Sequence, residues 1–198
     1  MTSLAQLALD ASTCTRCPLA AGRTQVVFGV GDPAARLLFV GEGPGRDEDL
    51  EGEPFVGRSG QLLDRLLREE LGLERSAIYI ANVVKCRPPG NRDPRPEEVA
   101  TCRPWLDSQI ELIDPAVIVT LGNFATKLLL ATTDGITRLR GHTYDVGGRN
   151  VVPTFHPSAA LRSGGGEPLA QMRADFVRAK EILSGVQGPS GPLSGVPA

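Results

Sequence analysis

Four cysteines, and no others, constrain how this chain of 198 residues can fold. Cys14 and Cys17 form a Cys-x-x-Cys pair near the start, whereas Cys86 and Cys102 lie far downstream. Two ligands separated by two residues can hold an ion from a single turn, and a distant pair completes the site when the chain folds back. The sequence therefore predicts one four-ligand metal or cluster site that ties the N-terminus to the middle of the chain.

Length and composition indicate a single domain. The hydrophobic fraction of 41% is enough for one core, and the chain is too short for two ordinary domains. No signal segment and no apolar run of roughly 18 residues is evident, so we expect a cytoplasmic protein without membrane contact. A reducing compartment favours thiolates on a metal over disulfides. Residues 185–198 are rich in Gly, Pro and Ser, which predicts a flexible tail after a domain over 1–184.

The charge balance excludes a protein that coats nucleic acid without specificity. Such proteins are basic overall, whereas this chain has a formal net charge of -2. Any surface that binds nucleic acid must therefore be local, built from arginines near turns and loop ends.

Short apolar runs alternate with helical patterns along the chain. The apolar runs read as buried parallel strands over 37–40, 78–84, 117–121 and 151–155. The helical patterns cover 60–73, with Ser59 as N-cap, and 96–113, 123–130 and 169–183. This alternation predicts an α/β fold, a three-layer α/β/α sandwich with a central four-stranded parallel sheet.

In such a sheet, ligands bind beyond the carboxyl ends of the strands. The loops there cover 41–49, 85–91, 122–123 and 156–158, and we expect them to meet at one edge. Asn82 ends an apolar strand, where its amide must find partners or incur a desolvation cost. His156 follows another strand, and Phe55 lies in a loop beside Pro54 and Gly57, where packing into the core explains an aromatic ring less readily.

Four segments carry a resemblance to a known family. They are Gly41-Glu42-Gly43-Pro44-Gly45, Pro54-Phe55-Val56-Gly57-Arg58-Ser59-Gly60, Asn82-Val83-Val84-Lys85-Cys86-Arg87-Pro88-Pro89 and Phe155-His156-Pro157-Ser158. In this order, and with the spaced cysteines, they resemble the iron-sulfur uracil-DNA glycosylases, family 4 of their superfamily. Four thiolates alone fit either zinc or a cluster. The resemblance implies a structural [4Fe-4S] cluster on the four cysteines, in place of zinc.

Removal of uracil from DNA requires a pocket that accepts a base turned out of the stack. Phe55 offers a flat face for that base, and the amide of Asn82 matches the N3 and O4 edge of uracil. A neutral His156, aided by backbone amides of Glu42 and Gly43, would stabilise the negative charge that develops on uracil O2.

The first loop departs from relatives outside the family. Those relatives carry an aspartate and a tyrosine where this chain has Gly43 and Gly45. The resemblance implies that Glu48 lies near uracil C5, where it would clash with the methyl group of thymine. Glu42 is the candidate for water activation on chemical grounds. Ser59 is expected to donate a hydrogen bond at the start of a helix.

A DNA surface is expected around these loops. Arg87, Arg92 and Arg162 would contact phosphates, and Ser158 would donate a hydrogen bond at the loop start. After His156, the resemblance implies an intercalating segment in which Leu161 is the candidate wedge.

The predicted function is that of a monofunctional uracil-DNA glycosylase. It would release free uracil from single- or double-stranded DNA, leave an abasic site that initiates base excision repair, and act as a monomer. The lysine in these four loops, Lys85, is expected to point toward the cysteines, so no lysine is placed as a Schiff-base nucleophile. Two alternatives stay open here: a glycosylase for other deaminated bases such as hypoxanthine or xanthine, and a noncatalytic module that binds zinc and nucleic acid.

Overall fold

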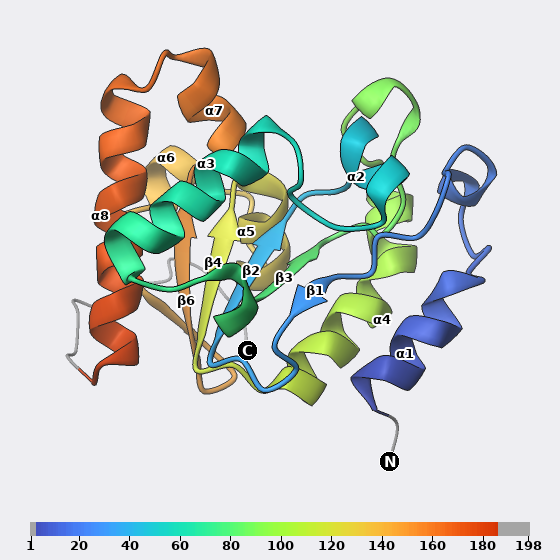
Figure 1. Cartoon of the computed structure of the whole chain (residues 1–198), viewed down its shortest axis with the longest axis horizontal. Helices are drawn as coiled ribbons and strands as arrows, with labels where there is room; N and C mark the ends of the chain where they lie inside the picture. Colours follow the sequence, from blue (N-terminus) through green and yellow to red (C-terminus); the bar gives the residue numbers. More distant parts are fainter. Residues whose placement is uncertain (1–2, 186–198) are drawn as a thin grey trace.

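The computed structural model describes residues 3–185, and a six-stranded sheet in the order β1-β3-β2-β4-β6-β5 forms their centre (Figure 1). The strands are β1 (Val30–Gly31), β2 (Leu37–Gly41), β3 (Tyr79–Asn82), β4 (Val117–Leu121), β5 (Tyr144–Val146) and β6 (Arg149–Thr154). β3, β2, β4 and β6 are parallel to one another. The predicted parallel core is therefore confirmed. The predicted tail lies, apart from Gly185, outside the described residues.

Two edge strands were missed in the sequence. β1 pairs antiparallel with β3, and β5 pairs antiparallel with β6. They are two and three residues long, so neither shows a recognisable pattern of alternation. The expected strand over 78–84 is shorter, because regular pairing stops at Asn82. The expected strand over 151–155 begins earlier, at Arg149, and ends at Thr154.

Eight α-helices surround the sheet in the described part of the chain. They are α1 (Leu4–Ser12), α2 (Arg46–Glu51), α3 (Arg58–Leu66), α4 (Pro96–Ile113), α5 (Asn123–Leu130), α6 (Ile136–Leu139), α7 (Pro157–Arg162) and α8 (Gly166–Leu183). A π-helical turn, Leu67–Leu71, continues α3, and short 3-10 turns cover Pro18–Ala21, Arg75–Ala77 and Pro89–Asn91. None of the helices within residues 3–185 is both long and apolar enough to cross a membrane.

Two of the expected helices have other bounds: the helix expected over 60–73 is α3 with its π-helical turn and ends at Leu71, and the last helix begins earlier than expected. Ser59 is not an N-cap, because α3 begins one residue before it, at Arg58, and Gly57 occupies the cap position. The last helix begins at Gly166 and so includes a turn that carries little apolar pattern. By contrast, α4 and α5 have the predicted bounds. Pro96 opens α4 at a position where its missing N–H is not needed.

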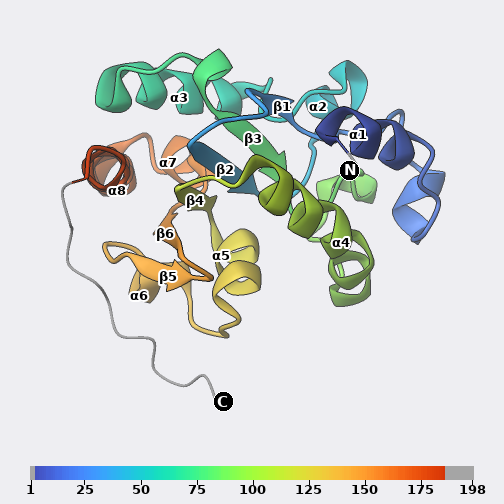
Figure 2. The same ribbon diagram turned by 90° about the horizontal axis from the view of Figure 1, so that it is seen from below.

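The helices form a layer on each face of the sheet, as Figure 2 shows. Alternate residues of β2 point to opposite faces. Leu38 and Val40 belong to a core cluster with residues of α1, α4 and α5. Leu37 and Phe39 belong to a second cluster with residues of α3, α7 and α8. Every residue of β2 is buried, as expected for a strand covered on both sides.

Candidate active site

The loops at the carboxyl edge of the parallel strands enclose one cleft of about 720 Å³. Ten of the predicted site residues line it: Glu42, Gly43, Glu48, Phe55, Ser59, Asn82, Arg92, His156, Ser158 and Arg162. Arg87 and Leu161 are not among the lining residues. Arg87 donates to the side chain of Asn91, and Leu161 packs against the second core cluster. The folded chain therefore gathers most, but not all, of the predicted residues.

Phe55 is held in an unusual backbone conformation on the floor of this cleft. Its φ is +57°, a left-handed value that is uncommon for residues other than glycine, and its side chain is buried. A Cβ on Gly41 would lie 2.6 Å from the Phe55 ring, and a Cβ on Gly60 would fall on the Phe55 carbonyl group. The side chain of Arg75 donates to the backbone oxygens of Pro54 and Phe55. Two glycines and one arginine thus fix the ring position.

Asn82 closes β3 and is only 2% exposed. Its Oδ1 atom finds no hydrogen-bond partner within the described residues. A buried polar atom without a partner costs about 1 to 3 kcal/mol, and such atoms are rare in native proteins. Because Asn82 lines the cleft, a bound ligand can supply the missing donor.

His156 is the N-cap of α7, and its ring lies beside that of Phe55, with centroids 5.7 Å apart and the planes tilted by 35°. Its Nδ1 atom accepts the backbone N–H of Ser158 at 3.2 Å and lies 2.8 Å from the Ser158 hydroxyl oxygen. Burial, together with the charge of Arg162, lowers the pKa of His156 to about 4. A neutral ring whose Nδ1 accepts carries its proton on Nε2, which is then a hydrogen-bond donor.

Glu42 follows β2 and is partly buried at the side of the cleft. Burial, and secondly the negative charge of Asp93, raises the pKa of Glu42 to about 7. A carboxylate with such a pKa can take up or release a proton near neutral pH. Asp93 also lines the cleft and had no role in the sequence-based prediction.

Glu48 connects two loops through its carboxylate. One oxygen accepts the backbone N–H of Gly45 at 3.0 Å, and the other accepts those of Val56 and Gly57 at 3.1 Å each. The side chain therefore joins the start of α2 to the loop that carries Phe55. A sequence pattern with glutamate three residues after a cap position indicates the first of these contacts, but not the second.

Arginines lie along the rim of the cleft. Arg46 and Arg58 are exposed there, and both were missed, although each is the first residue of a helix after a glycine-rich loop. Arg162 donates to the Ser158 hydroxyl group at 3.2 Å. Arg92 donates to both carboxylate oxygens of Glu98, a buried side chain whose pKa these bonds lower to about 2.

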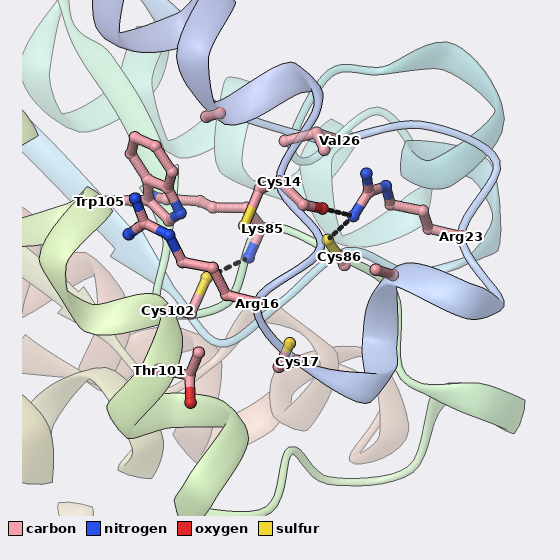
Figure 3. A pocket seen from close by; sticks show the side chains of 12 residues that line it. Cys14, Arg16, Cys17, Arg23, Val26, Lys85, Cys86, Thr101, Cys102 and Trp105 are labelled. Atoms are coloured by element: carbon pink, nitrogen blue, oxygen red, sulfur yellow. Dashed lines mark hydrogen bonds between the residues drawn. The ribbon is translucent and has the colours of Figure 1, made fainter.

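The four cysteines line a second, small pocket (Figure 3). Cys86 and Cys102 are buried, Cys14 and Cys17 are half-buried, and all four thiols are free. Among the described residues, no group of three or more potential ligands is arranged to hold one metal ion.

Burial raises the pKa of the Cys86 and Cys102 thiols, and each of these two sulfur atoms accepts a hydrogen bond that opposes this effect. The backbone N–H of Lys85 donates to the sulfur of Cys102 at 3.2 Å, and the side chain of Arg23 donates to that of Cys86 at 3.4 Å. Hydrogen bonds of this kind stabilise sulfur atoms that carry negative charge. The guanidinium of Arg16 lies over the Trp105 ring in the same pocket. The donor set therefore fits a thiolate-ligated group.

Comparisons with known proteins agree with this arrangement. Residues 28–180 match the family model described as the uracil DNA glycosylase superfamily. A type-4 uracil-DNA glycosylase from Thermotoga maritima is 50% identical over 86% of this chain and 89% of its own length. Proteins with the same name from Sulfurisphaera tokodaii and Archaeoglobus fulgidus are 43% and 46% identical, over 92% and 81% of this chain and 86% and 84% of their own. The chain therefore belongs to the type-4 uracil-DNA glycosylases.

Proposed function

We propose that the cleft between Phe55, Asn82 and His156 binds uracil turned out of DNA and hydrolyses the bond that joins it to deoxyribose. The observation that carries this proposal is the buried Asn82 amide, whose Oδ1 atom lacks a partner among the described residues. The N3–H group of uracil would donate to that oxygen, and uracil O4 would accept from Nδ2. Cytosine presents the opposite pattern at this edge, so a fixed amide would reject it.

Phe55 would stack on the flat face of the base. Stacking of a base on an aromatic side chain is worth about 1 to 3 kcal/mol. The ring is already fixed by its contacts with Gly41 and by the close approach of Gly60 to its backbone. Little side-chain entropy would therefore be lost on binding.

His156 would stabilise the leaving group. As the bond from C1′ to N1 breaks, its electron pair goes to uracil, and negative charge accumulates on O2. The Nε2–H donor of a neutral His156 would face that charge, together with backbone amides of Glu42 and Gly43. A preorganised donor of this type typically lowers the activation free energy by about 2.7 to 4 kcal/mol.

Glu42 would position the water that completes the reaction. The water oxygen forms the new bond to C1′, and its proton passes to the Glu42 carboxylate, from which it can return to the uracil anion. Glu42 would thus take the role of the aspartate that relatives outside the family carry at the position of Gly43. Glu48 would lie near uracil C5 and exclude the methyl group of thymine, which stays a prediction. The three backbone amides that donate to its carboxylate would hold the side chain in place for that role.

Strand cleavage is not expected. No lysine lines the cleft within the described part of the chain, so a Schiff base with the sugar has no candidate amine there. Lys85 is buried beside the cysteines, where it donates to the Asn82 backbone oxygen and the Gln109 side chain. We infer that the reaction stops at free uracil and an abasic site.

The four cysteines would hold a [4Fe-4S] cluster. All four cysteines line the same small pocket, and two of their sulfur atoms accept hydrogen bonds, as sulfur ligands of iron-sulfur clusters do. When bound, the cluster would serve as a structural crosslink between the N-terminal segment and α4. Hydrolysis transfers no electron to it.

DNA would cross the rim of the cleft. Arg46, Arg58 and Arg162 are exposed there and would contact phosphates, with Ser59 and Ser158 as further donors. Arg92 already forms an ion pair with Glu98. Arg87 would contact phosphate from outside the cleft. Leu161 stays the candidate wedge, although its side chain is partly packed on the core. Single- or double-stranded DNA would bind to a monomer, with an affinity that falls with salt concentration.

Release of uracil from an oligonucleotide with one deoxyuridine tests the proposal. An identical strand with thymine, and strands with hypoxanthine or xanthine, run beside it. We expect release from the uracil strand alone, a strong reduction by His156→Ala, and no reduction by His142→Ala, which changes an exposed histidine. Full activity of His156→Ala would refute the assignment of this cleft.

A further inference from the structure

Residues 23–25 lie between the cysteine pocket and the active-site loop. The side chain of Arg23 donates to the Cys14 backbone oxygen at 2.6 Å and to the Cys86 sulfur at 3.4 Å, as Figure 3 shows. Two residues downstream of this segment, the Val27 N–H donates to the Lys85 oxygen at 2.8 Å. The segment is therefore anchored on both parts of the chain that supply Cys14 and Cys86.

The same segment is attached to α2. The backbone N–H of Thr24 donates to both oxygens of Asp49, at 2.9 and 3.1 Å. The side chain of Gln25 donates to the Leu50 backbone oxygen at 2.6 Å. Asp49 is 2% exposed and does not line the uracil cleft. The proposed chemistry thus leaves this buried carboxylate without a role.

On its other side, α2 holds the loop that carries Phe55. Glu48, the residue before Asp49, accepts the backbone N–H groups of Val56 and Gly57. A continuous series of hydrogen bonds and short covalent steps therefore runs from the sulfur of Cys86, through Arg23 and Thr24, to α2 and the Phe55 loop.

We propose that residues 23–25 form a strut that sets the position of α2 and the Phe55 loop from the cysteine centre, and that Asp49 is a positioning residue for the stacking face. The inference rests on the proposed metal centre, which would then influence uracil binding through the position of the Phe55 loop. The effect passes through packing and hydrogen bonds, without contact between the centre and DNA. It requires that release of either end of the strut loosens the Phe55 loop.

Asp49→Ala tests this strut at the end remote from the cysteines, and Glu51→Ala, an exposed carboxylate on the same helix, is the matched control. Hydrogen exchange, iron content and steady-state kinetics are measured on each purified full-length protein. In Asp49→Ala we expect unchanged iron content, faster exchange over 46–58 and unchanged exchange over 14–22. The KM for an oligonucleotide with one deoxyuridine should rise about 5- to 30-fold with kcat retained.

Two further samples separate the strut from the metal centre. Asp49→Asn keeps one acceptor for the Thr24 N–H and should recover part of the protection over 46–58. Removal of iron from the unmodified protein should speed exchange over both 14–22 and 46–58. Protection of 46–58 in Asp49→Ala equal to that in Glu51→Ala would overturn the strut. A protein that binds no iron would overturn the proposed centre, whereas the Asp49→Ala comparison would still decide whether α2 is positioned by this contact.

Discussion

Individual residues of the cleft acquire their chemistry from burial. Burial lowers the pKa of His156, raises that of Glu42 and leaves the Oδ1 atom of Asn82 without a partner among the described residues. Each effect follows from removal of a polar group from water: charge is disfavoured, and an unpaired oxygen seeks a donor. Changes of single residues in the cleft should therefore alter its protonation or its hydrogen bonds with the base.

Asn82→Asp should impair uracil recognition without a change in side-chain shape. A carboxylate cannot donate to uracil O4 and repels it. The loss of about 2 kcal/mol of transition-state stabilisation should lower kcat/KM on uracil roughly 30-fold. Asn150→Asp, a change of the same kind at the opposite end of a strand, is the control. Competition between uracil and cytosine oligonucleotides measures the effect, and unchanged discrimination would contradict this role for the amide.

The pH profile should report Glu42. A base must be ionised, and the pKa of Glu42 is raised to about 7, so single-turnover uracil release should slow as the pH falls below about 7. His156, with its pKa lowered to about 4, stays neutral in this window. Asp93→Asn removes a neighbouring negative charge and should shift the acid limb to lower pH. Glu42→Gln should abolish that limb and slow the reaction.

A flat profile for the unmodified protein would exclude Glu42 as the base. An acid limb that persists in Glu42→Gln would show that another group titrates.

At the scale of elements, close approach between loops and helices defines the pocket. β2 ends in Gly41, α3 contains Gly60, and both glycines leave room for the Phe55 segment between them. On the outer side, the ion pair of Arg140 with Asp175 joins the residue after α6 to α8. The guanidinium of Arg140 also lies 5.7 Å from the ring centroid of Phe155, the residue before His156.

Gly41→Ala should damage the base pocket through shape alone. The new Cβ would clash with the Oδ1 atom of Asn82 and lie 2.6 Å from the Phe55 ring, so we expect a loss of about 1 to 3 kcal/mol in the free energy of unfolding and weaker uracil binding. Gly135→Ala is the control, because its Cβ meets no atom within 4 Å and its φ is -83°. Urea unfolding and uracil inhibition would measure the two effects, and equal behaviour of the two variants would refute this packing argument.

Arg140→Met should loosen α8. The Asp175 carboxylate has no exposed surface, so removal of its bidentate partner should cost about 3 to 5 kcal/mol of unfolding free energy. Arg138→Met, from the exposed pair with Asp134, should stay within about 0.5 kcal/mol of the unmodified protein. Denaturant midpoints compare the two, and a small loss in Arg140→Met would show that Arg178 alone satisfies Asp175.

At the scale of the whole molecule, the cysteine pocket is lined by parts that are far apart in sequence. α1 packs on α4, and the four cysteines come from the segment after α1, the segment after β3, and α4 itself (Figure 1). A thiolate-ligated group at this point would restrain the N-terminal segment and the loop between Cys86 and Cys102 together. Metal binding and folding are then coupled.

If the four cysteines hold the proposed cluster, the purified protein should contain iron and be brown, and Cys102→Ala should abolish both. Loss of one ligand should lower the thermal midpoint by about 10 °C, which corresponds to about 4 kcal/mol for a chain of this size. Thr101→Ala, on the same helix and beside the same pocket, should keep both the iron and the midpoint. A coloured, equally stable Cys102→Ala protein would show that the ligand assignment is wrong.

The sequence by itself determined the four parallel strands, the bounds of α4 and α5, and the membership of Asn82 and His156 in one site. Local patterns are sufficient for these features, because apolar period and length distinguish strands from helices. The rule that strand ends meet at one edge then places both side chains. The spacing of the cysteines likewise belongs to the chain and not to its folded form.

Only the tertiary structure decided the rest. The edge strands β1 and β5 exist through pairing with partners, not through their own two or three residues. The raised pKa of Glu42 depends on burial and secondly on Asp93, and the contact of Thr24 with Asp49 joins distant segments. These features arise from groups that come into contact only in the folded chain, where burial and distance set the energy of each interaction. No local periodicity in the sequence predicts such contacts.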